Sequence, residues 1–253
     1  MCTVTWWRAP EAGGYELFFN RDERRARGPA APPTRAECAG VPYLAPTDAD
    51  QGGTWLLVNV HGVTLGLVNY YPDEPAPAEA PPLSRGLLLR ELADVASVAA
   101  VGERLATSAL RRCGGFYLLA LGSGTSARRW RWDTRALRDE SSFELWPFLS
   151  SSSFRGPEIA AHRRACFARE CAGPGQLAPA DLARFHLRRE PDRPAWGILM
   201  DRPDARTVSV SHLTVEAGRE AVFSYATRPA ADGAPPEPPV ELRLPLRGRP
   251  VPA

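Results

Sequence analysis

Residues 2–24 read CTVTWWRAPEAGGYELFFNRDER, and this stretch specifies how the fold begins. Residues 3–7 and 15–19 are rich in β-branched and aromatic side chains, and Gly13-Gly14 lies between them. Two such runs around a glycine-rich turn predict a β-hairpin. If the turn is centred near residues 11 and 12, every residue of the first strand has a definite partner on the second.

Cys2 is the first candidate for chemistry. Its side chain is small, so we expect Met1 to be removed and cysteine to become the mature N-terminus. The α-amine, with a pKa of about 7.7–8.0, would then lie next to a thiol with a pKa of about 8.5. Such a residue carries its own base, which is the arrangement of an activated nucleophile. Most cysteines at position 2 have no such role.

Asn20-Arg21-Asp22-Glu23 is the second candidate, because the hairpin places Arg21 opposite Cys2 with Asn20 and Asp22 on either side. A carboxylate there could hold the α-ammonium group, and an arginine could favour the thiolate. The alternative is a solvated run of charges, since two further arginines follow directly.

The rest of the chain alternates predicted hairpins and helices. Strands are expected at residues 53–60, 63–70, 116–121, 127–132, 207–215 and 221–226, and helices at 84–95, 97–110, 157–171 and 179–188. Residues 26–36 and 72–83 are expected to be loops. Hairpins with paired helices between them indicate an α+β fold of antiparallel sheets covered by helices. We expect one domain over residues 1–228 and a proline-rich tail over 229–253, extended or partly disordered.

Composition excludes several classes of function. A formal net charge of +2 argues against a nucleic-acid partner, and the absence of lysine excludes Schiff-base chemistry. No apolar run is long enough to span a membrane, and we expect no signal peptide, because the first residues lack a basic segment followed by an apolar run. Five irregularly spaced cysteines do not form a disulfide framework. We therefore expect a cytoplasmic protein with reduced thiols.

Other constellations are weaker. His162 and Cys166 have the i,i+4 spacing of zinc ligands, but two further ligands are not evident, so no metal or other cofactor is expected. A Cys/His dyad with His61, His186 or His212 is possible, although each of these histidines fits a surface or satisfied core position better.

Four motifs taken together resemble a known family. Met1-Cys2, Asn20-Arg21-Asp22-Glu23, Gly52-Gly53-Thr54-Trp55-Leu56 and Asn69-Tyr70 are similar to the Asn-Arg-Asp-Glu family, also called the Transport and Golgi organisation 2 family. That family in turn resembles the cysteine N-terminal-nucleophile (Ntn) hydrolases, which include penicillin V acylase, bile salt hydrolase and acid ceramidase. The resemblance implies a four-layer αββα sandwich with the nucleophile at the start of a central strand.

The resemblance also implies roles for individual residues. Cys2 would be the nucleophile and Asp22 would position its amine. Arg21 or Arg206 would fix a carboxylate or the aspartate. The oxyanion would be stabilised by the Tyr70 backbone N–H, with help from Asn69 or Ser151. Asn20 and Trp55 are expected to contact the substrate.

These roles describe an amide hydrolase or acyltransferase that acts on an N-acyl or related small amide. The alternative is a non-catalytic binding or trafficking protein that holds an acyl chain, acyl-CoA or haem in the same cleft.

Overall fold

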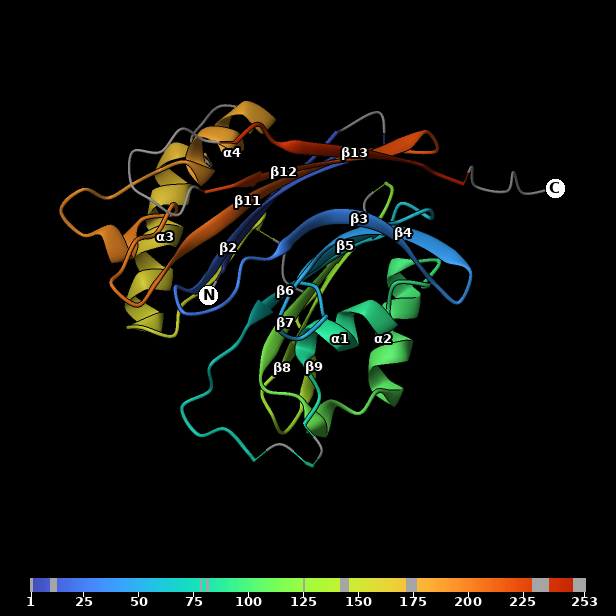
Figure 1. The fold of residues 1–253 in the computed structure, drawn as a ribbon, viewed down its shortest axis with the longest axis horizontal. Coiled ribbons are helices and arrows are strands. Elements are labelled where there is room, and N and C mark those ends of the chain that lie inside the picture. The colour runs from blue at the N-terminus through green and yellow to red at the C-terminus, as the bar shows by residue number, and fades with distance from the viewer. Residues whose placement is uncertain are drawn as a thin grey trace.

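The computed structural model describes residues 2–9, 13–77, 79–80, 82–124, 126–141, 146–171, 177–228 and 237–247. Two antiparallel sheets lie face to face, and a pair of helices covers the outer face of each (Figure 1). The α+β class and the αββα layer order expected from the sequence are both confirmed.

The first sheet contains the N-terminal strand in its interior. Its order is β10 (Phe148–Ser151), β1 (Cys2–Arg8), β2 (Tyr15–Arg24), β11 (Ala205–Glu216), β12 (Glu220–Thr227) and β13 (Val240–Pro245). Because β1 pairs with β10 on one side and β2 on the other, Cys2 begins a strand that is hydrogen-bonded on both edges.

The second sheet is a meander in which each strand pairs with the next along the chain. Its order is β3 (Ala31–Cys38), β4 (Val41–Thr47), β5 (Leu56–Asn59), β6 (Thr64–Asn69), β7 (Phe116–Leu121), β8 (Ala127–Trp132) and β9 (Leu137–Asp139). Such a meander follows from short turns between neighbouring strands.

The α-helices of the described residues, four in number, form the outer layers, as Figure 1 shows. They are α1 (Arg85–Glu91), α2 (Val98–Thr107), α3 (Gly156–Glu170) and α4 (Pro179–His186), with single 3₁₀ turns at Leu110–Arg112 and Pro194–Trp196. The Ser97 hydroxyl caps α2 by accepting from the Ala100 N–H at 3.2 Å, as expected for a serine in this position. No helix among the described residues is both long and apolar enough to cross a membrane.

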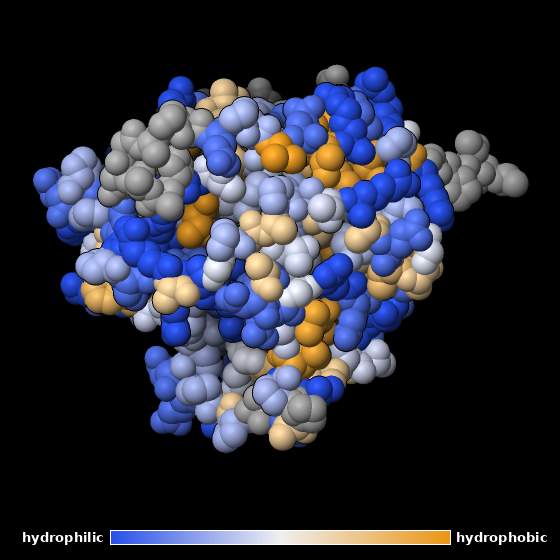
Figure 2. Space-filling model, in the orientation of Figure 1, coloured by the Kyte–Doolittle hydropathy of each residue, from blue (hydrophilic) through white to orange (hydrophobic). Residues whose placement is uncertain are grey.

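Three hydrophobic cores lie between the four layers. The central core joins the facing sides of the two sheets and includes Val4, Phe19, Leu56 and Phe223. A second core packs α1 and α2 onto the second sheet, and a third packs α3 and α4 onto the first. Figure 2 shows hydrophobic side chains on the visible face only as separated patches among hydrophilic ones.

Several segments differ from the sequence expectation. Strands β4, β9 and β10 were not expected, and two further segments have a structure other than the loop or the tail expected for them. Residues 26–36 were expected to be a loop, but β3 begins at Ala31, at the edge of the second sheet. A register shift between Ala31 and Thr34 accommodates the two prolines, which lack the N–H needed for regular pairing. The tail contributes β13, which pairs with β12 and buries Leu244 in the central core, so the sheet continues past the expected domain end at residue 228.

Candidate functional site

A cavity lies at the N-terminal end of β1, where the two sheets and the start of α1 meet. Its lining includes Cys2, Arg21, Asp22, Trp55 and Asn69, which are five of the expected site residues. These residues come from β1, β2, the segment before β5, and the end of β6. Strands from both sheets therefore bring together motifs that are up to 67 positions apart, counting from Cys2 to Asn69.

The strand register determines which side chains share a face with Cys2. Cys2 pairs with Arg21 on β2, as the hairpin symmetry predicts, and with Ser151 on β10. Directly opposed residues point to the same side of a sheet, so the Cys2 thiol lies between Arg21 and Ser151. The buried Ser151 hydroxyl has no hydrogen-bond partner among the described residues.

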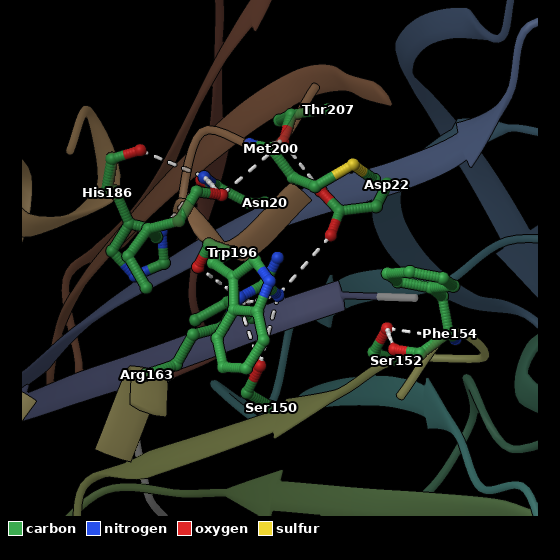
Figure 3. A network of polar contacts seen from close by, with 12 residues as sticks. Asn20, Asp22, Ser150, Ser152, Phe154, Arg163, His186, Trp196, Met200 and Thr207 are labelled. Atoms are coloured by element: carbon green, nitrogen blue, oxygen red, sulfur yellow. Dashed lines mark hydrogen bonds and ion pairs between the residues drawn. The ribbon is translucent and has the colours of Figure 1, made fainter. Parts of the chain in front are cut away.

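The Asp22 side chain is directed to the opposite face, toward the helical layer (Figure 3). Its Oδ1 accepts a hydrogen bond from the Thr207 hydroxyl at 2.6 Å, and Arg163 Nη1 lies 3.5 Å from its Oδ2. Within the described part of the chain, Oδ2 makes no hydrogen bond although it is fully buried. A buried carboxylate oxygen is normally satisfied by a donor, so Oδ2 has the capacity to accept a hydrogen bond.

Arg163 of α3 is the residue at the centre of this network. Its guanidinium donates to the hydroxyls of Thr3 and Ser150 at 3.1 and 3.2 Å and to the Trp196 carbonyl at 3.3 Å (Figure 3). The residue is only 1% exposed. A buried arginine is normally paired with a carboxylate, and Asp22 is that partner.

Arg163 was not among the site residues expected from the sequence, although a signal for it is present there. Ile159, Arg163 and Phe167 are spaced four residues apart and are all buried on one face of α3. A charged residue at a core position of a helix indicates a buried ion pair or a functional site.

The surroundings of the Cys2 thiol mostly favour its protonated form. Burial raises the pKa of the thiol, and the negative charge of Asp22 acts in the same direction. The positive charge of the N-terminus lowers the pKa of the thiol, and the Asp22 backbone N–H and the Arg21 guanidinium lower it by smaller amounts. Formation of the thiolate therefore needs a nearby base.

Arg21 is held in a fixed position beside Cys2. It forms ion pairs with Glu23 at 3.1 Å and Asp48 at 3.0 Å, and its guanidinium carbon lies 4.2 Å from the centre of the Trp55 ring. A guanidinium stacked on an aromatic face and paired with two carboxylates has little freedom to move. Trp55 therefore helps to hold the Arg21 guanidinium in place beside the cavity.

Arg85, at the start of α1, also lines the cavity and was not expected from the sequence. It donates to the Gly115 carbonyl at 2.9 Å. The helix approaches the cavity closely because Gly53 and Gly86 cross without side chains. A Cβ atom on Gly53 would lie 2.5 Å from the carbonyl carbon of Gly86. The Gly52-Gly53 motif thus serves close packing at the edge of the site.

Tyr70 differs from the expectation that its N–H is free for an oxyanion. That N–H donates to the Gly115 carbonyl at 3.0 Å and extends the pairing of β6 with β7. The Tyr70 ring packs on Tyr117 and under Arg131, and Tyr70 is not among the residues that line the cavity. Asn69 does line it, and donates from Nδ2 to the Tyr71 hydroxyl at 3.2 Å.

Asn20 lies outside the cavity, contrary to the substrate contact expected for it. Its register partner is Thr3, so its side chain points into the helical layer. Nδ2 donates to the carbonyls of His186 and Ile198 at 2.9 and 3.0 Å, and Oδ1 is 2.7 Å from His186 Nδ1. With its amide fully used and no exposed surface, Asn20 attaches α4 to the sheet.

Arg206 pairs in register with Glu23 and donates to the Arg228 carbonyl at 3.2 Å. It is not among the residues that line the cavity. The arginine that lies against the Asp22 carboxylate is Arg163, and neither Arg206 nor Arg21 forms an ion pair with it among the described residues.

The three remaining histidine candidates also lie elsewhere. His186 is buried between Thr5 and Asn20, His212 stacks on Phe18, and His61 lies in the turn after β5. None of them lines the cavity that contains Cys2.

His162 and Cys166 are joined by Glu190, so three possible metal ligands lie within 4.8 Å of one another. Two guanidinium groups contact the same atoms, since Arg188 Nη2 is 2.8 Å from Glu190 and Arg169 Nη2 is 3.6 Å from the Cys166 sulfur. These positive charges favour an ion-pair network over a cation site.

Several solved structures share this fold. Penicillin V acylase from Agrobacterium tumefaciens has a TM-score of 0.51 and 13% identity, covering 89% of this chain and 83% of that chain. A mutant conjugated bile acid hydrolase from Clostridium perfringens has a TM-score of 0.51 and 13% identity, covering 90% and 89%. At this identity the likeness shows the fold.

A third structure is the Caenorhabditis elegans ortholog of N-acylethanolamine-hydrolyzing acid amidase. It has a TM-score of 0.56 and 12% identity, covering 84% of this chain and 92% of that chain. No curated protein matches the sequence.

The family comparison covers the residues that build the cavity. The sequence model of the Transport and Golgi organisation 2 family matches residues 1–147, which is more than half of the chain. This range contains Cys2, the Asn20–Glu23 motif, Trp55 and Asn69. The chain therefore belongs to the Transport and Golgi organisation 2 family.

Proposed function

We propose that the protein is an N-terminal-cysteine amide hydrolase or acyltransferase with Cys2 as its nucleophile. One observation carries the proposal. Asp22 Oδ2 is buried beside Cys2 without a hydrogen bond from any described residue. Removal of Met1 would create an α-ammonium group on Cys2, which is the kind of donor that this oxygen lacks.

The proposed reaction begins with transfer of the thiol proton to the α-amine of Cys2. The thiolate sulfur then bonds to the amide carbonyl carbon, and the carbonyl oxygen becomes an oxyanion. When this intermediate collapses, the C–N bond breaks and the α-ammonium returns its proton to the leaving amine. Water, deprotonated by the same amine, attacks the thioester, releasing the acid and restoring the thiol. In acyl transfer, an acceptor amine replaces the water.

Two side chains support the oxyanion in this proposal. The Ser151 hydroxyl lies across from Cys2 in the sheet and has no partner among the described residues. Asn69 lines the cavity, and an asparagine amide carries two N–H donors, of which one is engaged with Tyr71. They replace the backbone donor expected at Tyr70. Prearranged donors that face developing charge stabilise the transition state.

Arg163 and Arg21 act as positioning residues. Arg163 lies against Asp22 and supplies a counter-charge that holds the carboxylate in place for the α-ammonium group. Arg21, held by Glu23, Asp48 and Trp55, provides a fixed positive charge beside the sulfur. The fold neighbours are named as an acylase, a conjugated bile acid hydrolase and an acid amidase, which is consistent with this chemistry.

The first test is the intact mass of the full chain expressed in a bacterium. Loss of Met1 is expected, and a retained Met1 would leave the amine acylated and remove the base. The purified protein is then incubated with N-acyl amino acids, the reaction is quenched in acid, and the mass of the protein is measured by mass spectrometry. An added acyl mass on the peptide that begins at Cys2 is the expected result.

Two variants control this experiment. Cys2→Ala abolishes both the adduct and amide hydrolysis, whereas Cys38→Ala, which removes a thiol that does not line the cavity, leaves both unchanged. Turnover by Cys2→Ala at the rate of the parent protein would disprove the mechanism.

A further inference from the structure

Arg85 differs from the other arginines that line the Cys2 cavity. Arg21 and Arg27 both form ion pairs with Asp48 and Glu23. Arg85 has no carboxylate within ion-pair distance among the described residues, and its one hydrogen bond there goes to a neutral carbonyl. Among the described residues that line it, the cavity therefore contains one cation without an acidic partner.

The acidic side chains of the cavity are already committed. Glu23 and Asp48 hold Arg21 and Arg27, and Asp22 lies against Arg163. Burial lowers the pKa of Arg85, which means that the surroundings do not fully compensate its charge. A guanidinium nevertheless remains charged at neutral pH.

Arg85 is held in place at the cavity that contains Cys2. Its guanidinium is tethered to Gly115, and the crossing of Gly53 and Gly86 holds the first turn of α1 against the segment before β5. Arg85 lines both the cavity that contains Cys2, of about 110 Å³, and an adjoining hollow of about 470 Å³, and Asn69 lines both as well. Arg85 therefore lies where these two spaces meet.

We propose that Arg85 binds a carboxylate of the substrate, so that the enzyme acts on small anionic amides. This inference rests on the proposed function and specifies its substrate class. A guanidinium binds a carboxylate through two parallel hydrogen bonds, which orient as well as attract it. The charged lining, which includes Arg21, Glu23, Arg27 and Asp48, disfavours a long acyl chain or haem in the same space.

The test measures binding by calorimetry to the full-length Cys2→Ala protein, in which no turnover occurs. The probes are N-acetylglycine and its neutral isostere N-acetylglycinamide. N-acetylglycine is expected to bind about tenfold more tightly or better, because a charge-assisted hydrogen bond is stronger than a neutral one. Arg85→Gln in the same background is expected to remove this preference.

Two further variants separate the site from general charge and from folding. Arg111→Gln removes an exposed arginine outside the cavity and should keep the preference. Arg85→Lys keeps the positive charge but not the paired donors, so it should keep part of the preference for N-acetylglycine. It also provides a second test of the site if Arg85→Gln fails to fold. Equal affinity for the two probes, or no binding of either, would overturn the inference.

The two proposals fail in different ways. If N-acetylglycine binds through Arg85 but the parent protein forms no acyl adduct on Cys2, the carboxylate site stands and the hydrolase does not. If the parent protein cleaves neutral amides as fast as anionic ones, and Arg85→Gln does not change the rates, the hydrolase stands and the carboxylate site does not.

Discussion

Arg163 and Asp22 show how a few residues set the charge balance of the candidate site. Both side chains are nearly inaccessible, and neither has another ionic partner within the described ranges. Two charges removed from water stabilise each other only as a pair, and loss of one partner leaves the other buried and unpaired. The pair joins α3 to β2, at the residue that follows the register partner of Cys2.

Arg163→Met should lower the free energy of unfolding by about 3–5 kcal/mol, because it leaves the Asp22 carboxylate without a counter-charge. Asp22→Asn should also destabilise the protein. The double variant should lose much less than the sum of the two, since it removes both charges. Urea unfolding followed by circular dichroism measures all three, and simple additivity would show that the two side chains do not interact.

Thiol labelling tests the role of the Cys2 amine. A chain with residues left in front of Cys2 should react slowly with iodoacetamide at pH 7 and faster at higher pH, because burial raises the pKa of its thiol. The mature chain should react faster at pH 7, since its amine can take the proton. Cys113 and Cys171, whose burial raises their pKa to about 11, serve as internal references in peptide mass spectrometry. Equal rates at Cys2 in the two forms would contradict the proposed base.

At the scale of elements, one contact places α1 on the second sheet and another places α4 on the first. Helix α1 meets the segment before β5 where Gly53 crosses Gly86, and the Thr54 N–H donates to the Gly86 carbonyl at 3.1 Å. Helix α4 is attached to β1 and β2 through His186, which contacts Thr5 and Asn20 at 2.8 and 2.7 Å. The first contact determines where Arg85 lies, and the second closes the helical layer beside the Asp22 network.

Gly53→Ala should destabilise the protein by about 1–3 kcal/mol, because the new methyl group overlaps the backbone of α1 and forces the two segments apart. Gly156→Ala is the matched control. A Cβ atom at Gly156, in the first turn of α3, meets nothing within 4 Å, so this change should stabilise by up to about 1 kcal/mol. Thermal unfolding of the two variants should shift in opposite directions, and a neutral Gly53→Ala would mean that the crossing is not tight.

His186 should make stability depend on pH. Burial lowers the pKa of His186 from 6.5 to about 3, so between these values the unfolded chain binds a proton that the folded chain does not. The contribution of neutral His186 to the free energy of unfolding is therefore complete above pH 6.5. It is lost as the pH falls toward 3, by up to about 1.4 kcal/mol per pH unit. His186→Gln should flatten the profile of unfolding free energy between pH 4 and 6, and an unchanged slope would place the pH dependence elsewhere.

At the scale of the whole molecule, the C-terminal strand completes the first sheet. β13 pairs with β12 from Glu220 to Tyr225 and covers an edge that would otherwise be open. Leu244 has no exposed surface and belongs to the core between the two sheets. The tail therefore contributes to the stability of the αββα sandwich.

Leu244→Ala should lower the free energy of unfolding by about 2–4 kcal/mol through the cavity it leaves in the central core. Leu242→Ala, at a partly buried position on the same strand, should cost less. A chain that ends at residue 228 should unfold at a lower temperature than the full chain and associate through the exposed edge of β12. Identical melting curves for the short and full chains would show that the tail strand is dispensable.

The N-terminal hairpin, its register and the family all follow from the sequence alone. Patterns of period two and the glycines between them specify local pairing, and so the position of Arg21 opposite Cys2 was predictable. Boundaries of the strands at residues 116–121 and 127–132 were also predicted correctly, because a short glycine-rich turn separates two clear runs.

The meeting of the polar groups, by contrast, depends on the tertiary structure. Side chains alternate along β2, so Asn20 and Asp22 both point to the helical face. The Tyr70 N–H is used in the pairing of β6 with β7. The packing of α3 on the sheet brings Arg163 next to Asp22. These contacts join residues from distant parts of the chain, such as Asp22 and Arg163. Such contacts depend on how whole elements pack, which local propensity does not encode. Strands β4, β9 and β10 were also not predicted. For β3 and β13 the reason is that prolines mask the strand pattern, while an available sheet edge still pairs with the chain.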